Sequence, residues 1–300
     1  MILEKTTRPS IGILGLAAAM SLAFAGVAGA SMAPTPITAT GWNQDSILSP
    51  NANSTGPAAV TTAGTVSFGN GYNGSSTLFF GSGFANDTKG LPTADTGTNT
   101  FVSAATNTVT GGNTTFQLQD TLVTGSSSAG YVGTNNVLYL YNSTTGLGAP
   151  GTLTLSTPTA YSSLAILATS ANASSTTSGT FVVNFANGTS SSAFTFSAPD
   201  WGNGTGIASE AVPNGFDRYD SGASPTTGGH TFGLYETDVA LSGVEATTPI
   251  TGITFNSGGA QTGVFAISGV ASPVPEPAVL PLMGIAGFGL LILKRRFARA

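Results

Sequence analysis

Short apolar runs that alternate with polar residues, each closed by a turn signal, recur along most of this sequence. The strongest example runs over Thr180–Phe185, turns at Asn187-Gly188 and returns over Ser192–Ser197. Asn-Gly between two alternating runs favours a type I′ hairpin turn, in which both residues take positive φ. A side-chain period of two is the period of a strand with one buried face, so the pattern predicts antiparallel β structure.

No segment between Pro34 and Val270 has a convincing helical period. Further strands are expected at intervals of roughly 8 to 15 residues, a spacing typical of a β-sandwich or a jelly roll. We therefore expect an all-β domain over residues 34–270, with a division near residue 150 as the lesser alternative. The further expected strands are Thr65–Phe68, Thr77–Phe80, Thr114–Val123, Val137–Tyr141, Thr152–Leu155, Leu164–Thr169, Thr231–Tyr235, Ile250–Phe255 and Gly263–Ser268.

The composition favours a folded chain over a disordered one. Only 7% of the 300 residues are charged, but 17 Phe and 7 Tyr are present, mostly inside the apolar runs. Disordered segments lack such aromatic content. The chain has no cysteine, which excludes disulfides, thiolate catalysis and cysteine metal sites. A core large enough to be stable without cross-links is therefore expected.

The few charges are unevenly distributed. Residues 31–277 contain two basic residues, Lys89 and Arg218, against twelve acidic residues, which gives this part a net charge of −10. Such an acidic body repels phosphate backbones, so no nucleic-acid partner is expected.

The N-terminus has the features of a secretory signal peptide over residues 1–30. Lys5 and Arg8 precede an apolar stretch, Ile11–Ala25, and small residues follow at Ala28 and Ala30. Small residues at these two positions predict cleavage by signal peptidase after Ala30. The alternative is an uncleaved membrane helix. Cleavage predicts an exported protein.

The C-terminal tail, residues 271–300, has three parts in a fixed order. The motif Pro275, Glu276 and Pro277 comes first, an uncharged run over 278–293 follows, and basic residues over 294–299 end the chain. The run predicts a single transmembrane helix, because flanking Lys and Arg can snorkel and extend a span that is shorter than about 20 residues. The basic end, with Lys294, Arg295 and Arg296, is expected to stay cytoplasmic.

This order of Pro-Glu-Pro, short helix and Arg-rich end resembles the PEP-CTERM sorting domain of Gram-negative bacteria. The resemblance implies recognition by an exosortase, a membrane transpeptidase that removes the helix near the motif. It also implies transient residence in the inner membrane, followed by transfer to the cell surface or the extracellular matrix. The alternative is an ordinary single-span tail anchor, which would need no Pro-Glu-Pro motif.

Catalytic groups are sparse, so we expect no enzymatic activity and no cofactor. His230 is the one histidine, and no Gly-x-Ser-x-Gly elbow accompanies it. A metal site built from several histidines is excluded for the same reason.

Acidic residues nevertheless concentrate between Asp200 and Glu245, and three interpretations compete. They are structural groups in loops and ion pairs, oxygen ligands of a Ca²⁺ ion, or polar contacts of a carbohydrate site with an aromatic platform. A glycosidase carboxylate pair is a special case of the third. The possible ligand or Ca²⁺ contacts are Asp200, Trp201, Asp217, Arg218, Tyr219 and Glu236.

Eight Asn-x-Ser/Thr sequons occur, and these are candidate glycosylation sites if the body is modified. They begin at Asn53, Asn73, Asn86, Asn113, Asn142, Asn172, Asn187 and Asn203. Together with the two terminal signals, the sequence favours a structural or adhesive surface protein associated with exopolysaccharide. The alternative is a carbohydrate-binding module, with or without Ca²⁺, that uses residues 200–236.

Overall fold

The structure, a computed structural model, is almost entirely β in the part of the chain that it describes. That part comprises residues 32–44, 47–48, 77–80, 91, 100–119, 135–142, 147–171, 173–174, 176–202, 207–212, 218–220, 232–258 and 261–273. Within these residues the only helix is one turn, α3 (Val244–Thr247). The all-β prediction is confirmed. The chain divides into two units, Met1–Met32 and Ala33–Ala300, and every element named below belongs to the second.

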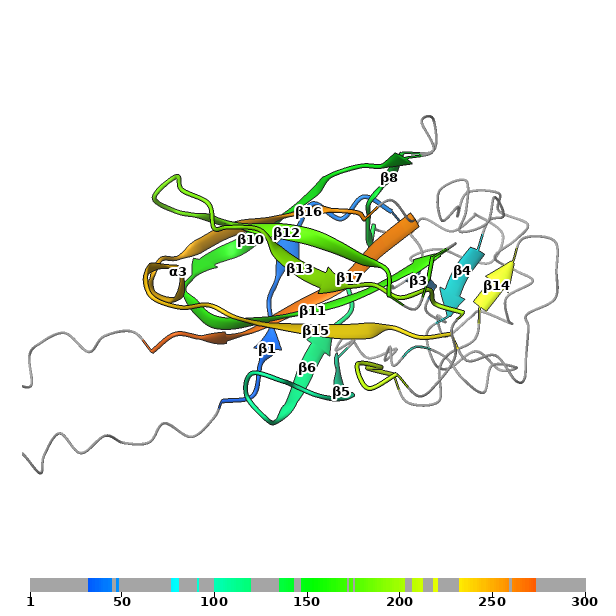
Figure 1. Cartoon of the computed structure of the whole chain (residues 1–300), viewed down its shortest axis with the longest axis horizontal. Helices are drawn as coiled ribbons and strands as arrows, with labels where there is room; N and C mark the ends of the chain where they lie inside the picture. The colour runs from blue at the N-terminus through cyan, green and yellow to red at the C-terminus, as the bar shows by residue number, and fades with distance from the viewer. Residues whose placement is uncertain are drawn as a thin grey trace, which may run out of the picture. The chain divides into compact units, whose positions relative to one another are not determined.

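Two antiparallel sheets form the centre of this unit (Figure 1). The first sheet has the order β1-β17-β11-β15, and β7 also pairs with β17. The second sheet has the order β13-β12-β16-β10-β2. The strands of the first sheet are β1 (Thr35–Pro36), β17 (Gln261–Ala271), β11 (Tyr161–Ala171), β15 (Tyr235–Ala240) and β7 (Leu138–Tyr139). Those of the second sheet are β13 (Phe194–Ser197), β12 (Ser178–Phe185), β16 (Ile250–Asn256), β10 (Gly151–Thr159) and β2 (Ala39–Thr40).

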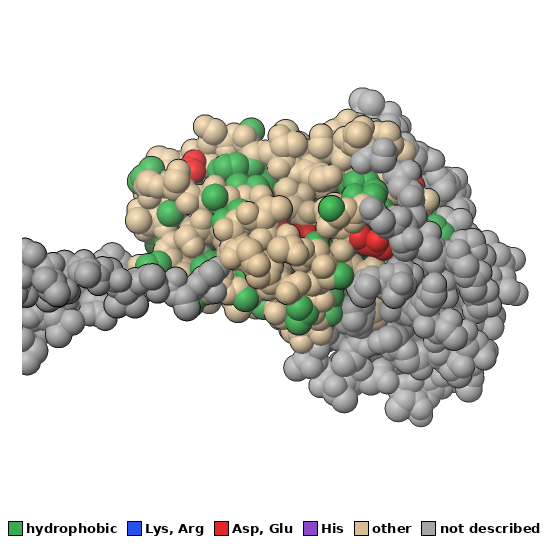
Figure 2. All heavy atoms as spheres, turned by 60° about the horizontal axis from the view of Figure 1, so that its bottom comes forward, with side chains coloured by type: hydrophobic (Ala, Val, Ile, Leu, Met, Phe, Trp, Pro, Cys, Tyr) green, Lys and Arg blue, Asp and Glu red, His purple; other side chains and the backbone are tan. Residues whose placement is uncertain are grey.

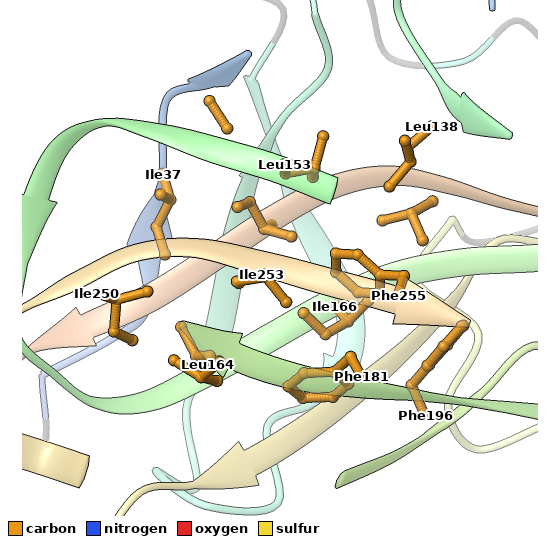
Figure 3. Packing of buried hydrophobic residues seen from close by; sticks show 14 of the residues in the cluster. Ile37, Leu138, Leu153, Leu164, Ile166, Phe181, Phe196, Ile250, Ile253 and Phe255 are labelled. Atoms are coloured by element: carbon orange, nitrogen blue, oxygen red, sulfur yellow. The ribbon is translucent and has the colours of Figure 1, made fainter. Parts of the chain in front are cut away.

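The two sheets face each other across a shared hydrophobic core (Figure 3). Alternate residues of each strand point into it, as the period of two requires. Leu164 and Ile166 enter from the first sheet, and Ile253 and Phe255 enter from the second. Phe181 lies among three other rings, with centroid distances of 5.3 Å to Phe194, 6.4 Å to Phe196 and 5.6 Å to Phe255.

The first sheet is covered on its other face as well. On β11, Ala165 and Leu167 point away from the shared core into a second cluster that also contains Phe116 and Phe265. A register shift where Leu167 and Ala168 pair with β17 marks a bulge there. Strands buried on both faces are continuously apolar rather than alternating. This explains why β11 appears in the sequence as an unbroken apolar run.

A hairpin of β5 (Thr100–Thr106) and β6 (Asn113–Gln117) contributes to this second layer. Three further β pairings complete the described structure, and the one between β3 and β4 is parallel. The strands involved are β3 (Ile47–Leu48), β4 (Thr77–Phe80), β14 (Arg218–Asp220), β8 (Tyr141–Asn142) and β9 (Leu147–Gly148).

The hairpin predicted over Thr180–Ser197 is present as β12 and β13, but its loop is not the predicted type I′ turn. Gly188 N donates to Phe185 O at 3.0 Å, and Phe185 N donates to Thr189 O at 2.9 Å. The turn is therefore centred on Ala186 and Asn187, and Gly188 follows it with φ of 82°. A turn followed by a residue of positive φ is the usual three-residue hairpin loop.

Several strand bounds differ from the prediction. The strand expected at Thr231–Tyr235 begins instead at Tyr235 and continues through the charged segment to Ala240. The strand expected at Val137–Tyr141 is split between β7 and β8. The predicted strand Thr65–Phe68, the signal peptide over 1–30, the Pro-Glu-Pro motif and the helix over 278–293 lie outside the described residues.

Candidate functional site

The most polar buried group in the described structure lies where β15 meets the β5–β6 hairpin. Glu236 and Asp238 are two residues apart on β15, so both side chains project from the same face of the first sheet. On the neighbouring strand β11 they pair with Leu167 and Ala165, which belong to the second apolar cluster. Both carboxyl groups therefore point toward the hairpin that covers this face.

Asn107, at the turn of the hairpin, joins the two carboxyl groups. Its Nδ2 lies 2.7 Å from Asp238 Oδ1, 3.4 Å from Glu236 Oε1 and 3.0 Å from Thr114 Oγ1. Thr114 donates from its hydroxyl to Glu236, and Thr108 donates from its backbone N to Asp238 Oδ2 at 2.8 Å. We call these five residues the carboxylate cluster. It fastens the hairpin to the edge strand β15 of the first sheet.

The turn is shaped around the Asn107 side chain. Asn107 Oδ1 accepts hydrogen bonds from the backbone N of Val109 at 3.0 Å and of Thr110 at 2.9 Å. Gly111 closes the turn by donating to Asn107 O at 2.8 Å, with φ of 74°. Asn side chains stabilise turns in this way by satisfying nearby backbone donors. One residue thus fixes the loop and also supplies the donor between the two carboxyl groups.

Glu236 is poorly solvated. It is 4% exposed, and its Oε2 is buried without a hydrogen-bond partner in the described structure. The pKa of Glu236 is raised from 4.5 to about 7, mainly by burial; hydrogen bonds from Ser103 and Thr114 lower it, and the neighbouring Asp238 adds to the rise. Near neutral pH the site therefore holds a proton that an exposed glutamate would have released.

Because folded Glu236 retains this proton, we predict that the free energy of unfolding falls as pH rises. Between pH 4.5 and about 7 folded Glu236 keeps a proton that the unfolded chain releases, so the free energy of unfolding falls across this window and levels off above it. The fall is on the order of 3 kcal/mol. Glu236→Gln, which is neutral at all pH values, should remove most of it in urea titrations at pH 5 and pH 8. Glu245→Gln on α3 should leave the fall in unfolding free energy unchanged. If both variants altered the fall equally, Glu236 would not be its cause.

Asp200 has a structural position. Its Oδ2 accepts from Ala173 N and its Oδ1 accepts from Gly202 N, both at 2.8 Å. Its backbone also forms an isolated bridge with Ser170 of β11. The carboxylate therefore holds two loop segments against the end of β11, in agreement with the first of the three interpretations of the acidic region.

Trp201 does not provide the exposed platform that a carbohydrate site would need. It is 2% exposed and belongs to the second apolar cluster, where its ring stacks on Phe232 at 4.5 Å with an interplanar angle of 24°. The expectation of a sugar contact at Trp201 is corrected accordingly. The bulky indole is buried because it fills the layer over the first sheet.

Tyr235 is buried near two acidic residues, Asp200 and Glu210. Its hydroxyl donates to Asp200 O at 3.2 Å. Burial, together with the charges of Glu210 and Asp200, raises the pKa of Tyr235 to about 12, so the phenol stays protonated. Its role here is that of a buried hydrogen-bond donor.

The remaining predicted contacts are only partly described. Arg218 and Tyr219 lie on β14, whose backbone pairs with Phe79 and Leu78 of β4, and their side chains are outside the description. Asp217 and His230 also lie outside it. The structure thus brings Glu236 together with Asp238, Asn107 and Thr114, and it places Asp200 in a separate loop contact. No feature of the sequence linked residues 103–114 to Glu236.

The described residues contain no group of three His, Cys, Asp or Glu side chains able to hold a metal ion. In the carboxylate cluster, N–H and O–H donors already point at three of the four carboxyl oxygens, so a Ca²⁺ ion would have to displace them. Among the same residues, no helix is long and apolar enough to span a bilayer.

Comparisons with known proteins add little. No protein-family model matches the chain, and no curated protein matches it. A solved structure that aligns with it is the enzymatically active domain of tailspike protein 4 of bacteriophage CBA120, at 13% identity and a TM-score of 0.22. The alignment covers 63% of this chain and 24% of the tailspike chain. A TM-score this low does not establish a shared fold.

Proposed function

We propose that this chain is an exported surface or matrix protein of a Gram-negative bacterium, with a β-sandwich or jelly-roll-like ectodomain. In this proposal an exosortase removes its C-terminal helix, and the body serves a structural or adhesive role in association with exopolysaccharide. The observation that carries the proposal is the order of Pro275-Glu276-Pro277, the uncharged run over 278–293 and the basic end, in a chain whose residues 1–30 have the sequence features of a secretory signal.

The position of the last strand is compatible with removal of the tail. β17 ends at Ala271, four residues before Pro275. Cleavage near the motif would leave every described strand in place, including the full length of β17 in the first sheet.

The surface chemistry supports association with a neutral polymer. None of the five strands of the second sheet contains a charged residue. On its outward face, Thr152 Oγ1 lies 3.0 Å from Thr254 Oγ1, which accepts from Asn184 Nδ2 at 3.0 Å. Figure 2 shows a face on which described carboxylates occupy small areas among apolar and neutral polar side chains. Neutral hydroxyls and amides can exchange hydrogen bonds with a polyhydroxylated polymer.

The test is the intact mass of the protein recovered from its native host. We expect loss of residues 1–30 and of the segment after about Pro277, and extra mass would reveal an attached group. Glu276→Gln should abolish most of this C-terminal processing, whereas Glu245→Gln should not affect it. A wild-type protein that loses its leader but keeps residues 278–293 would refute sorting and indicate a plain membrane anchor. A protein that keeps both ends would refute cleavage of the leader as well.

A further inference from the structure

The loop between β12 and β13 presents one of the eight sequons at the surface. Residues 186–190 are exposed, and the loop projects away from the two sheets (Figure 1). The sequon is Asn187-Gly188-Thr189, and no charged residue lies within residues 186–193. An enzyme that modifies folded protein could therefore reach this loop without disturbing either sheet.

The Asn187 amide is held by its oxygen. Oδ1 accepts from Thr189 N at 3.0 Å and from Thr189 Oγ1 at 2.7 Å. Its Nδ2 makes no hydrogen bond within the described structure, so the planar amide leaves its nitrogen on the side away from Thr189. The hydroxyl that defines the sequon thus orients the acceptor amide before any enzyme binds.

Asn113 provides an internal contrast. It is also exposed and also begins a sequon, but its Nδ2 donates to Ser103 O at 3.1 Å and to Ala105 O at 3.4 Å. Attachment of a glycan to Asn113 Nδ2 would break hydrogen bonds that join β6 to β5. The side chains of the other six sequon asparagines lie outside the described residues.

We propose that Asn187 is an N-glycosylation site of the exported protein. The step requires a glycosyl donor with a phosphate leaving group and a transferase of the host. Asn187 Nδ2 forms a bond to the anomeric carbon while the bond from that carbon to the phosphate oxygen breaks. The nitrogen loses one proton to a base of the transferase, and the phosphate leaves with the bonding electron pair. The proposal rests on export, since the glycan would be added to a surface-destined protein.

Competing self-modification is disfavoured by the same turn. In an Asn-Gly sequence the Gly nitrogen can attack the Asn carboxamide carbon, which releases ammonia and leads to Asp or isoaspartate. Here Gly188 N is engaged with Phe185 O at 3.0 Å, and the carboxamide oxygen is held by Thr189. The hairpin loop must open before that attack can occur.

The experiment is site-resolved mass spectrometry of peptides from the protein recovered from its native host. We expect a glycan on Asn187 in the wild type, retained in Thr189→Ser and lost in both Asn187→Gln and Thr189→Val. Asn113→Gln is the matched control and should leave the glycan in place. An unmodified Asn187, an Asp at this position, or a glycan on Ser190 instead would overturn the inference.

The termini read in the same sample separate this inference from the proposed function. Correctly processed termini with a bare Asn187 would overturn the glycosylation site alone. A glycan on Asn187 in a protein that keeps residues 278–293 would support the site and refute sorting by exosortase.

Discussion

Asn107→Asp should destabilise the protein by about 3 to 5 kcal/mol at pH 8, because it replaces the donor between two carboxyl groups with a third carboxylate. The new oxygen would lie about where Nδ2 now stands, 2.7 Å from Asp238 Oδ1 and 3.4 Å from Glu236 Oε1. The backbone bonds to Oδ1 can persist, so the loss measures the electrostatic role of the amide. Urea unfolding at pH 8 gives the difference in free energy.

The same variant should recover much of its stability at pH 5, where the added carboxyl group can be protonated in this crowded site. Asn256→Asp is the matched control, since Asn256 is exposed at the end of β16. It should change stability by less than about 0.5 kcal/mol. Equal effects of the two substitutions would show that the carboxylate cluster contributes nothing specific.

Phe181→Ala should cost about 3 to 5 kcal/mol at any pH at which the protein is folded, because it removes a fully buried ring from the shared core. The ring is surrounded by three other rings, those of Phe194, Phe196 and Phe255. Because these packed rings can relax only partly, the substitution should leave a cavity. The urea midpoint should fall, and the slope of the transition should stay the same. Thr180→Ala, at the exposed neighbouring position, should have little effect. A small loss for Phe181→Ala would mean that the two sheets do not share this core.

Local patterns were sufficient to predict β12, β13, β16 and the first part of β10 in the second sheet, and much of β11 and β17, but not the two-residue strand β2. The alternation in Thr180–Phe185 and Ile250–Phe255 arises because one face of each strand is buried and the other is wet. β15 was misplaced because its pattern is different. Glu236 and Asp238 occupy positions that face an apolar layer, and only the hairpin carrying Asn107 makes those positions tolerable for carboxyl groups.

The candidate site was less predictable than the fold. Acidic crowding in the sequence identified the segment that contains Glu236, but its partners lie far away in the chain; Asn107 and Asp238 are separated by 131 residues in sequence. No local rule connects a hairpin turn to a strand at that separation. Trp201 shows the opposite error. An aromatic residue next to an acidic one was interpreted as a binding platform, but its ring is buried in the second apolar cluster and stacks on Phe232.

The pairing of β1 with β17 has a consequence for the order of events in biogenesis. Thr35 and Pro36 pair with Gly269 and Ser268, so the first of the described strands pairs with the last of them. Contacts of such high sequence separation form slowly and only after most of the chain is available. The first sheet therefore cannot close until β17 has been synthesised, and under the export proposed above the body would reach the translocation channel with this sheet still open. Closure of this sheet depends on residues 261–271, near the C-terminal end of the body.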